Sequence, residues 1–333
     1  MRLGMGEQRV ARRLLVVVAM VSHLVFVSGS HSSAGEDHGS IPTTRPVISQ
    51  SVSPLHAISP IARDGHRGEG FLRKPPGEGP FPAAILIHGG LTTRPTEELR
   101  EYALSTHPSR FLEAGYVTVV ITYRSRDVDP TAQTPLPVSD CVAAIELVKA
   151  LPYVNPDSIL VTGTSGGGDL TLEAAAQLDV AAIAPEEPAA VLMAGLVVAD
   201  SSRARKADYI QLYRAREDHR EFRAKIARIS SPILILQGDH DTHSGLNRFS
   251  AAVLIPEIRA AGKTLEVITY PGEPHAFSFY SNSARTPRPA AALNAFRDID
   301  AFARRFVEVQ PVAIDPSLVR HEPVGPGQEA ALR

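Results

Sequence analysis

Cysteine is almost absent from this sequence. The single residue of this type, Cys141, excludes a disulfide within the chain, and no cysteine follows the apolar N-terminal stretch where a lipid would be attached. Cys141 lies in a run with helical periodicity, so we expect a small buried residue rather than a reactive thiol. A domain without disulfides depends on its apolar core, and a hydrophobic content of 44% predicts a sizeable one.

An excess of charge of either sign is also lacking. The formal net charge is −2 over 333 residues, and no run of lysine or arginine extends over a domain. Such a chain has no basic field to hold a polyanion, so nucleic acid is not expected as a partner. The sequence shows no internal repeat, and its length suits one large α/β domain.

Long apolar runs are missing as well. Arginines precede an apolar stretch over residues 14–27, which His23 interrupts and which is shorter than the roughly 20 residues of a membrane-spanning helix. Small residues follow it. This layout predicts a signal peptide over residues 1–29, cleavage after Gly29, no stable membrane anchor, and export to the periplasm or the cell exterior.

Composition divides the remainder of the chain. Residues 30–52, rich in Ser, Gly, Pro and Thr, predict a flexible leader, and residues 309–333 predict a disordered tail. Between them, residues 53–308 alternate short apolar runs with amphipathic stretches. This alternation predicts an α/β fold with a mostly parallel central sheet and helices on both faces. An Asp64-Gly65 pair between two short runs predicts an N-terminal hairpin.

The individual elements follow from periodicity and from turn residues. The expected strands cover residues 83–87, 117–123, 158–162, 180–184, 232–237 and 265–270. The expected helices cover residues 97–114, 138–151, 167–178, 245–261 and 290–306, with further helices between 185 and 228 that cap or line a pocket.

One strand runs directly into a catalytic motif. Residues 163–167 read Gly-Thr-Ser-Gly-Gly and fit G-x-S-x-G at the end of a β-branched run. This pattern is typical of a nucleophile elbow, a strained turn that lifts the hydroxyl of Ser165 clear of the sheet. The alternative is a simple Gly/Ser loop, so the rest of the chain must supply a base, an acid and an oxyanion site.

The acid and the base are expected after the last two strands. Asp241 follows the strand 232–237, and His275 follows the strand 265–270, which gives the chain order serine, aspartate, histidine expected of such an elbow. We therefore predict a triad of Ser165, Asp241 and His275. Asp239 competes as the acid, but we expect it to cap a turn.

Backbone N-H groups should supply the oxyanion site. The strand 83–87 runs into His88-Gly89-Gly90-Leu91, where glycines let the backbone approach a bound carbonyl. We assign the donors to Gly166, joined by Gly90 or Leu91, and expect His88 to brace this loop. A tight turn would have the same sequence.

Other polar groups are expected at the same edge. The residues of 239–243 include metal-ligand types, but no glutamate or second histidine pair at helical spacing completes a hydrolytic metal site, so no metal or other cofactor is expected. Glu186 and Glu187 are placed near Ser165; they could hold a substrate amine, but we interpret them as a solvated loop. Arg124 and Arg126 could hold a carboxylate, although nothing favours that role.

These motifs resemble the α/β-hydrolase superfamily, and within it the prolyl oligopeptidase catalytic domain and dienelactone-hydrolase-like proteins. The resemblance covers residues 55–307 and implies an α/β-hydrolase fold with a Ser-His-Asp mechanism. Prolyl oligopeptidase relatives usually carry a β-propeller, for which the leader is too short, and an aromatic residue where this chain has Gly166. Dienelactone hydrolases usually use cysteine where this chain has Ser165.

The sequence therefore predicts a secreted serine hydrolase that cleaves carboxylic esters. Its substrate would be a small-molecule ester or a short peptide. The alternatives are a peptidase of the prolyl oligopeptidase type, a non-catalytic binding protein of the same fold, and a metal-dependent hydrolase.

Overall fold

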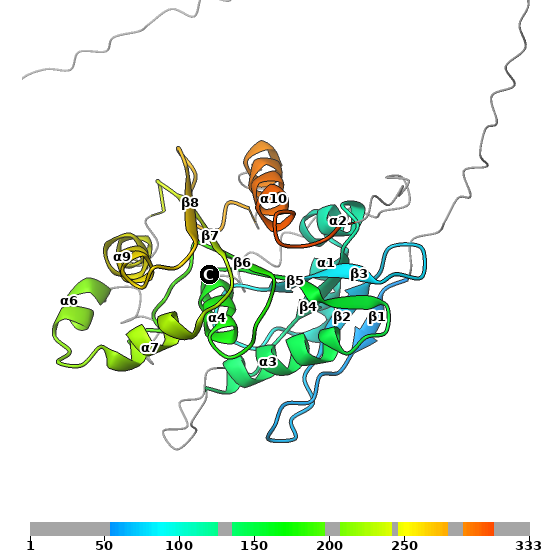
Figure 1. Cartoon of the computed structure of the whole chain (residues 1–333), viewed down its shortest axis with the longest axis horizontal. Helices are drawn as coiled ribbons and strands as arrows, with labels where there is room; N and C mark the ends of the chain where they lie inside the picture. Colours follow the sequence, from blue (N-terminus) through cyan, green and yellow to red (C-terminus); the bar gives the residue numbers. More distant parts are fainter. Residues whose placement is uncertain (1–53, 126–134, 197–206, 242–245, 279–288, 310–333) are drawn as a thin grey trace, which may run out of the picture. The chain divides into compact units, whose positions relative to one another are not determined.

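An eight-stranded sheet forms the centre of the described part of the chain (Figure 1). A computed structural model describes residues 54–125, 135–196, 207–241, 246–278 and 289–309, all within one compact unit, Ile48–Arg333. The predicted signal peptide and leader, and the tail from residue 310, lie outside these residues. The predicted domain limits, 53–308, stay a prediction.

The strands have the order β1-β2-β4-β3-β5-β6-β7-β8. The first two form the predicted hairpin, and β2 is antiparallel to β4, while the remaining neighbours are parallel. Their bounds are β1 His56–Ile58, β2 Gly70–Arg73, β3 Phe81–Ile87, β4 Val117–Ile121, β5 Val154–Thr164, β6 Ala182–Glu186, β7 Ile233–Gly238 and β8 Leu265–Tyr270.

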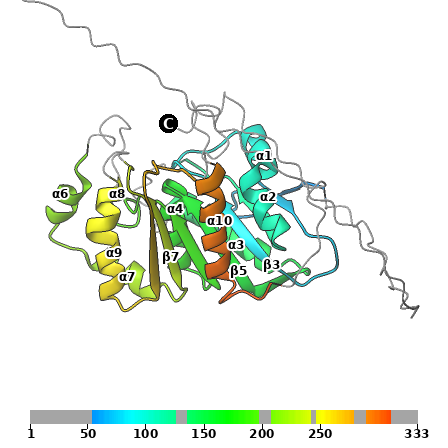
Figure 2. The same cartoon turned by 90° about the horizontal axis from the view of Figure 1, so that it is seen from above.

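Helices cover both faces of this sheet, as Figures 1 and 2 show. One face carries α1, α2 and α10, and the other carries α3, α4, α6, α7 and α9. The bounds are α1 Thr96–Leu104, α2 Thr106–Glu113, α3 Leu136–Lys149, α4 Gly166–Ala175, α6 Tyr209–Arg214, α7 Arg220–Arg228, α8 Leu246–Phe249, the π-helical η1 Ser250–Leu254, α9 Ile255–Ala260 and α10 Pro289–Ala303.

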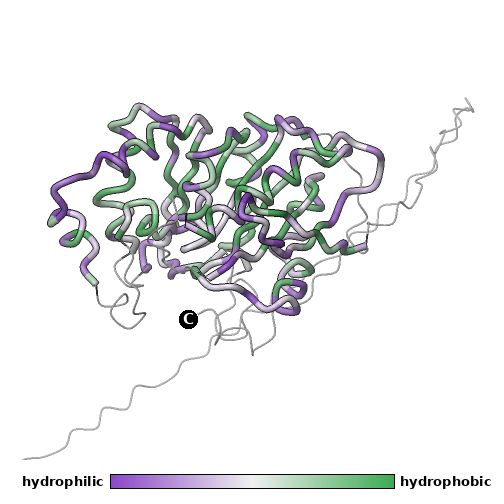
Figure 3. Tube along the Cα trace, turned by 90° about the horizontal axis from the view of Figure 1, so that it is seen from below, coloured by the Kyte–Doolittle hydropathy of each residue, from purple (hydrophilic) through white to green (hydrophobic). Residues whose placement is uncertain are grey.

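Alternating side chains of the strands build two cores. Ala83, Ile85 and Ile87 of β3 lie in the core beneath α3 and α4, whereas Ala84 and Leu86 lie in the core beneath α2 and α10. All five are buried, as expected of a parallel sheet covered on both faces. Hydrophobic residues accordingly gather on the strands in Figure 3. The prediction of a mostly parallel α/β sheet is confirmed.

Proline affects two of the predicted helices. The helix expected over residues 97–114 breaks at Ser105, which is extended (φ −71°, ψ 170°), because Pro108 cannot follow a continuous helix without clashing with the carbonyl four residues earlier. Within the first turn of a new helix its missing N-H costs nothing. The helix expected over 245–261 contains Pro256, and the π-helical turn η1 precedes it directly.

Ion pairs of Arg124 tie the end of β4 to α3 and to the hairpin turn. Arg124, just after β4, pairs with Asp140 of α3 at 2.7 Å and with Asp64 of the hairpin turn at 2.6 Å. Its guanidinium is therefore occupied by structural carboxylates, and Arg126 lies outside the described residues. Cys141 is fully buried, as predicted, and burial raises the pKa of its thiol. In the described ranges no helix has both the length and the apolar character needed to cross a membrane.

Candidate active site

Ser165 occupies a strained turn between β5 and α4. Its backbone has φ 56° and ψ −115°, a region that costs a non-glycine residue on the order of 1–3 kcal/mol. Backbone hydrogen bonds hold it there: its N-H donates to the Glu186 carbonyl (2.9 Å), and its own carbonyl accepts from the N-H groups of Asp169 (3.1 Å) and Ala189 (3.2 Å). The strand, turn and helix expected of a nucleophile elbow are all present.

The glycines around Ser165 are required by close backbone contacts. A Cβ on Gly163 would lie 2.6 Å from the Gly167 carbonyl oxygen, and a Cβ on Gly167 would lie 2.2 Å from that of Ile87. Real Cβ atoms do not approach so closely, so no larger residue fits at either position without moving the backbone. The elbow thus packs directly against the end of β3.

Asp241 and His275 meet at the ends of β7 and β8. Asp241 Oδ2 and His275 Nδ1 are 2.7 Å apart, and the Asp241 side chain is only 1% exposed against 16% for His275. Asp239 instead accepts a hydrogen bond from the Gly272 N-H at 2.6 Å and so caps the turn after β8. Of these two acids Asp241 therefore contacts His275 and Asp239 caps a turn, while the triad itself stays a prediction.

The segment that follows β6 connects Ser165 to the loop of His275. The backbone N-H of Ser165 donates to the Glu186 carbonyl, and the N-H of Ala276, the residue after His275, donates to the Glu187 carboxylate.

His88 braces the loop opposite the serine. Its ring is stacked on Tyr123 with centroids 4.4 Å apart, its Nδ1 lies 2.9 Å from the Gly89 carbonyl oxygen, and its Nε2 lies 3.2 Å from Thr122 Oγ1. Complete burial lowers the pKa of His88 to about 3, so the ring stays neutral near pH 7. These contacts therefore favour the structural role that we expect for His88.

The loop of His88 to Leu91 lies against the start of α4. A Cβ on Gly166 would be 2.0 Å from the Gly90 carbonyl oxygen and 3.1 Å from Leu91 Cγ. The Tyr123 hydroxyl lies 2.9 Å from that same oxygen and 2.9 Å from the His88 carbonyl oxygen, so it contacts two peptide groups of this loop. The three residues predicted to form the oxyanion site are thus brought together, and the absence of a side chain at Gly166 has a steric reason.

Glu186 and Glu187 are not a solvated loop, and that interpretation was wrong. They are 1% and 4% exposed, respectively, because β6 continues through Glu186 and both carboxyl groups turn inward. Thr162 Oγ1 and Ser278 Oγ donate to Glu186. Burial also removes them from any substrate amine. The only sequence signal was the position of both residues directly after a buried strand.

The metal alternative concerns the predicted cluster over residues 239–243. Among the described residues, the potential ligand atoms that lie within 4.8 Å of one another belong to Glu187, Asp241 and His275, so Asp241 is the member of that cluster in this group. Asp241 and His275 already bond to each other, and Glu187 accepts backbone N-H groups. His243 lies outside the described residues.

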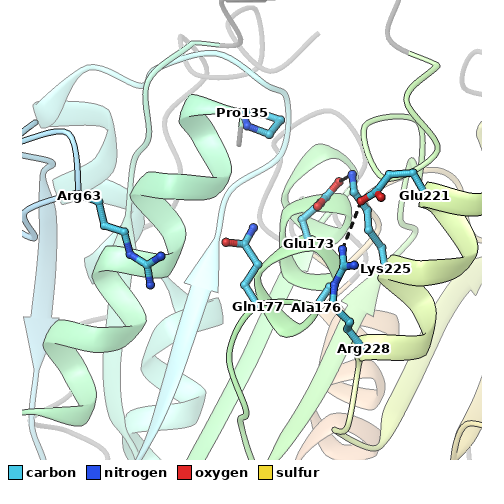
Figure 4. A pocket seen from close by; sticks show the side chains of 8 residues that line it. All are labelled: Arg63, Pro135, Glu173, Ala176, Gln177, Glu221, Lys225 and Arg228. Carbon is cyan, nitrogen blue, oxygen red and sulfur yellow. Dashed lines mark hydrogen bonds and ion pairs between the residues drawn. The ribbon is translucent and has the colours of Figure 1, made fainter. Parts of the chain in front are cut away.

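A cavity of about 420 Å³ lies between α4 and α7, away from the serine turn (Figure 4). Its wall includes Glu173 and three charged residues of α7, and none of the predicted triad residues. Lys225 pairs with Glu173 at 2.6 Å, and Arg228 pairs with Glu221 at 3.3 Å. The Lys225–Glu173 pair therefore joins α7 to α4, whereas the Arg228–Glu221 pair lies within α7.

Comparisons with known proteins identify the family of this chain. The prolyl oligopeptidase family matches residues 135–307, which hold the serine turn, Asp241 and His275. The chain belongs to the prolyl oligopeptidase family. It is accordingly a serine hydrolase. A second family model, BD-FAE, matches residues 72–189. No curated protein matches the chain.

Solved structures show the same fold at low sequence identity. Esterase Est22 is 16% identical to this protein, with a TM-score of 0.56, and the match covers 77% of this chain and 81% of the esterase chain. An esterase of Pyrobaculum calidifontis is 19% identical, with a TM-score of 0.52 and coverage of 76% and 87%. A candidate dienelactone hydrolase of Klebsiella pneumoniae is 17% identical, with a TM-score of 0.53 and coverage of 76% and 100%. The fold of this family member is the predicted α/β-hydrolase fold.

Asp169 ties α4 to the segment that follows β6 and gives the folded state a pH-dependent stability. Its buried carboxyl group accepts from the N-H groups of Leu192 (2.6 Å) and Met193 (3.1 Å), and burial, followed by the charge of Glu173, raises its pKa to about 7. The folded state therefore binds more protons than the unfolded state between about pH 4 and pH 7. The free energy of unfolding of the protein therefore falls as pH rises through that window.

We expect this dependence to be removed by Asp169→Asn. Relative to the variant, the wild type should lose on the order of 4 kcal/mol of stability between pH 4 and pH 8, because each pKa unit corresponds to about 1.4 kcal/mol. Urea unfolding of both proteins at several pH values measures the difference. Parallel stability curves would show that Asp169 does not titrate in this range.

Proposed function

We propose that this protein hydrolyses carboxylic esters of small molecules through a Ser165-His275-Asp241 triad. The observation that carries the proposal is the 2.7 Å contact between the buried Asp241 and His275, in a fold whose β5 ends in the strained Ser165 turn. Several structures with the same fold are named esterases, which supports ester substrates.

The geometry supports acyl transfer to water. His275 removes the proton of Ser165, and Asp241 holds the imidazole in the tautomer that exposes Nε2. The serine oxygen attacks the ester carbonyl, and the N-H groups of Gly166 and of Gly90 or Leu91 stabilise the oxyanion. His275 returns the proton to the leaving alcohol. A water molecule, deprotonated by His275, then releases the acid and restores the serine.

A fluorophosphonate probe combined with a substrate panel tests the proposal. The probe should label the folded protein at Ser165, identified by mass spectrometry of the modified peptide. Chromogenic acetate, butyrate and octanoate esters should be turned over, with prolyl and aminoacyl anilides as the comparison set. Labelling at another residue, or none in the folded protein, contradicts the mechanism and favours a binding protein.

A peptidase is the second candidate because the matching family is that of prolyl oligopeptidase. The sequence departs from that family at Gly166, where an aromatic residue is usual. Faster cleavage of the anilides than of the esters would establish the peptidase. Chelation should leave either activity unchanged, and a loss of activity on chelation would instead indicate a metal-dependent hydrolase.

We also propose that the protein is exported through the signal peptide over residues 1–29. The arginines followed by a short apolar stretch support this location. N-terminal sequencing of the protein after expression in its host should begin after Gly29. A full-length intracellular product would contradict export.

A further inference from the structure

Glu187 is a buried acid that contacts both loops of the predicted Asp-His pair. Its Oε1 accepts from the N-H of Gly238, which precedes Asp241 by three residues, at 3.2 Å. Its Oε2 accepts from the N-H of Ala276, the residue after His275. A single carboxyl group thus links the chain segments that carry the acid and the base.

Glu187 is also close to the imidazole itself. Its Oε2 lies 4.0 Å from His275 Nδ1, the same nitrogen that Asp241 contacts at 2.7 Å. Two carboxyl groups therefore face one ring nitrogen, from β6 on one side and from the end of β7 on the other. Glu187 is held by backbone on both sides: its own N-H donates to the Leu236 carbonyl at 2.7 Å.

Burial and charge repulsion both raise the pKa of Glu187. Its side chain has no exposed surface, and burial is the main reason that its pKa is raised well above the ordinary range. The charge of Asp241 is the next cause, and that of Glu186 on the same strand adds to it. His275 is the facing base. With both Asp241 and Glu187 ionised, two like charges would share one buried space.

We propose that Glu187 is a positioning residue of this active site and a reserve acid for His275. In the native protein it is neutral and holds the loops of Asp241 and His275 in register. When position 241 carries no charge, Glu187 releases its proton to solvent, and its carboxylate accepts the hydrogen bond from His275 Nδ1-H. The required approach is only about 1 Å. This inference rests on the proposed triad, but it assigns Glu187 a role that the triad does not contain.

A set of variants separates the two roles. Glu187→Gln should lower kcat about tenfold with KM unchanged, because an amide cannot accept both backbone N-H groups. Asp241→Asn should lower kcat by about 10²–10³-fold, less than the roughly 10⁴-fold loss expected where no other acid faces the histidine. The double variant that carries both Asp241→Asn and Glu187→Gln should have a kcat lower than that of Asp241→Asn by a further tenfold or more.

The pH profile gives a readout that a purely structural role would not change. The ratio of kcat/KM for Asp241→Asn to that for the double variant should rise with pH, because only the single variant has a carboxyl group that ionises beside His275. Glu186→Gln, combined with Asp241→Asn, is the matched control. Glu186 is an equally buried acid that bonds to Thr162 and Ser278. Its loss should keep the pH dependence but shift it to lower pH, because the charge of Glu186 no longer raises the pKa of Glu187.

Failure of this inference is distinguishable from failure of the triad. Fluorophosphonate labelling of Ser165 tests the triad by itself. If Ser165 is labelled but the double variant matches Asp241→Asn at every pH, Glu187 is not a reserve acid. If Glu187→Gln does not fold, Asp241→Asn alone decides: a loss near 10⁴-fold, with the pH dependence of the wild type, overturns the proposal.

Discussion

Replacing Ser165 with alanine should lower kcat for ester hydrolysis by about 10⁶-fold. The reason is that the hydroxyl oxygen forms the covalent bond to the acyl group, and no other side chain of the predicted site replaces it. The turn itself should survive, since the recorded contacts of Ser165 are backbone hydrogen bonds to Glu186, Asp169 and Ala189. Steady-state kinetics with a chromogenic ester, together with an active-site titration, measures the loss.

Ser165→Gly provides the matched control. It also removes the hydroxyl, but glycine adopts a φ of 56° without strain, so this variant should be about 1 kcal/mol more stable than Ser165→Ala. Both variants should be equally inactive. A folded Ser165→Ala protein that keeps most of its activity would remove Ser165 from the mechanism, whereas equal stability of the two variants would mean that the turn stores little strain.

Sequence patterns predicted the central strands well because most of them are apolar runs bounded by turn residues. The β8 strand has the predicted limits, Leu265–Tyr270, and the parallel order follows from the alternation with helices. The helix predicted over 97–114 is divided in two, whereas the one predicted over 245–261 is helical from 246 to 260 but contains a π-helical turn. An apolar period continues across Pro108 and Pro256, although the hydrogen-bond ladder does not.

The inward acids show what local sequence could not predict. Glu186 and Glu187 follow an apolar run, and two adjacent charges normally indicate solvent. Their burial depends on hydrogen-bond donors that come from distant positions, namely Thr162, Gly238, Ala276 and Ser278. The serine turn differs, because its glycines and its flanking strand lie within a few residues and so leave a local signature.

Gly166→Ala should lower kcat by about 10²–10³-fold, the typical cost of losing one oxyanion donor. The added Cβ would lie 2.0 Å from the Gly90 carbonyl oxygen, so the backbone of the loop or of the serine turn must move. Either movement displaces N-H groups assigned to the oxyanion. We also expect a loss of about 1–3 kcal/mol in unfolding free energy, as for other overpacked sites. Ester kinetics and urea unfolding measure the two effects.

A steric effect of this kind should be confined to positions with close backbone contacts. In the control variant Gly68→Ala, the atom nearest to the new Cβ is a side-chain carbon of Pro60 at 3.3 Å, which moves more easily than a backbone carbonyl. The kcat of this variant should therefore stay within threefold of the wild-type value. Fluorophosphonate labelling of Gly166→Ala should slow in proportion to its kcat, since the probe also develops charge on oxygen. Wild-type kinetics in Gly166→Ala would show that the loop of Gly90 moves freely, and the oxyanion donors would then have to be sought outside it.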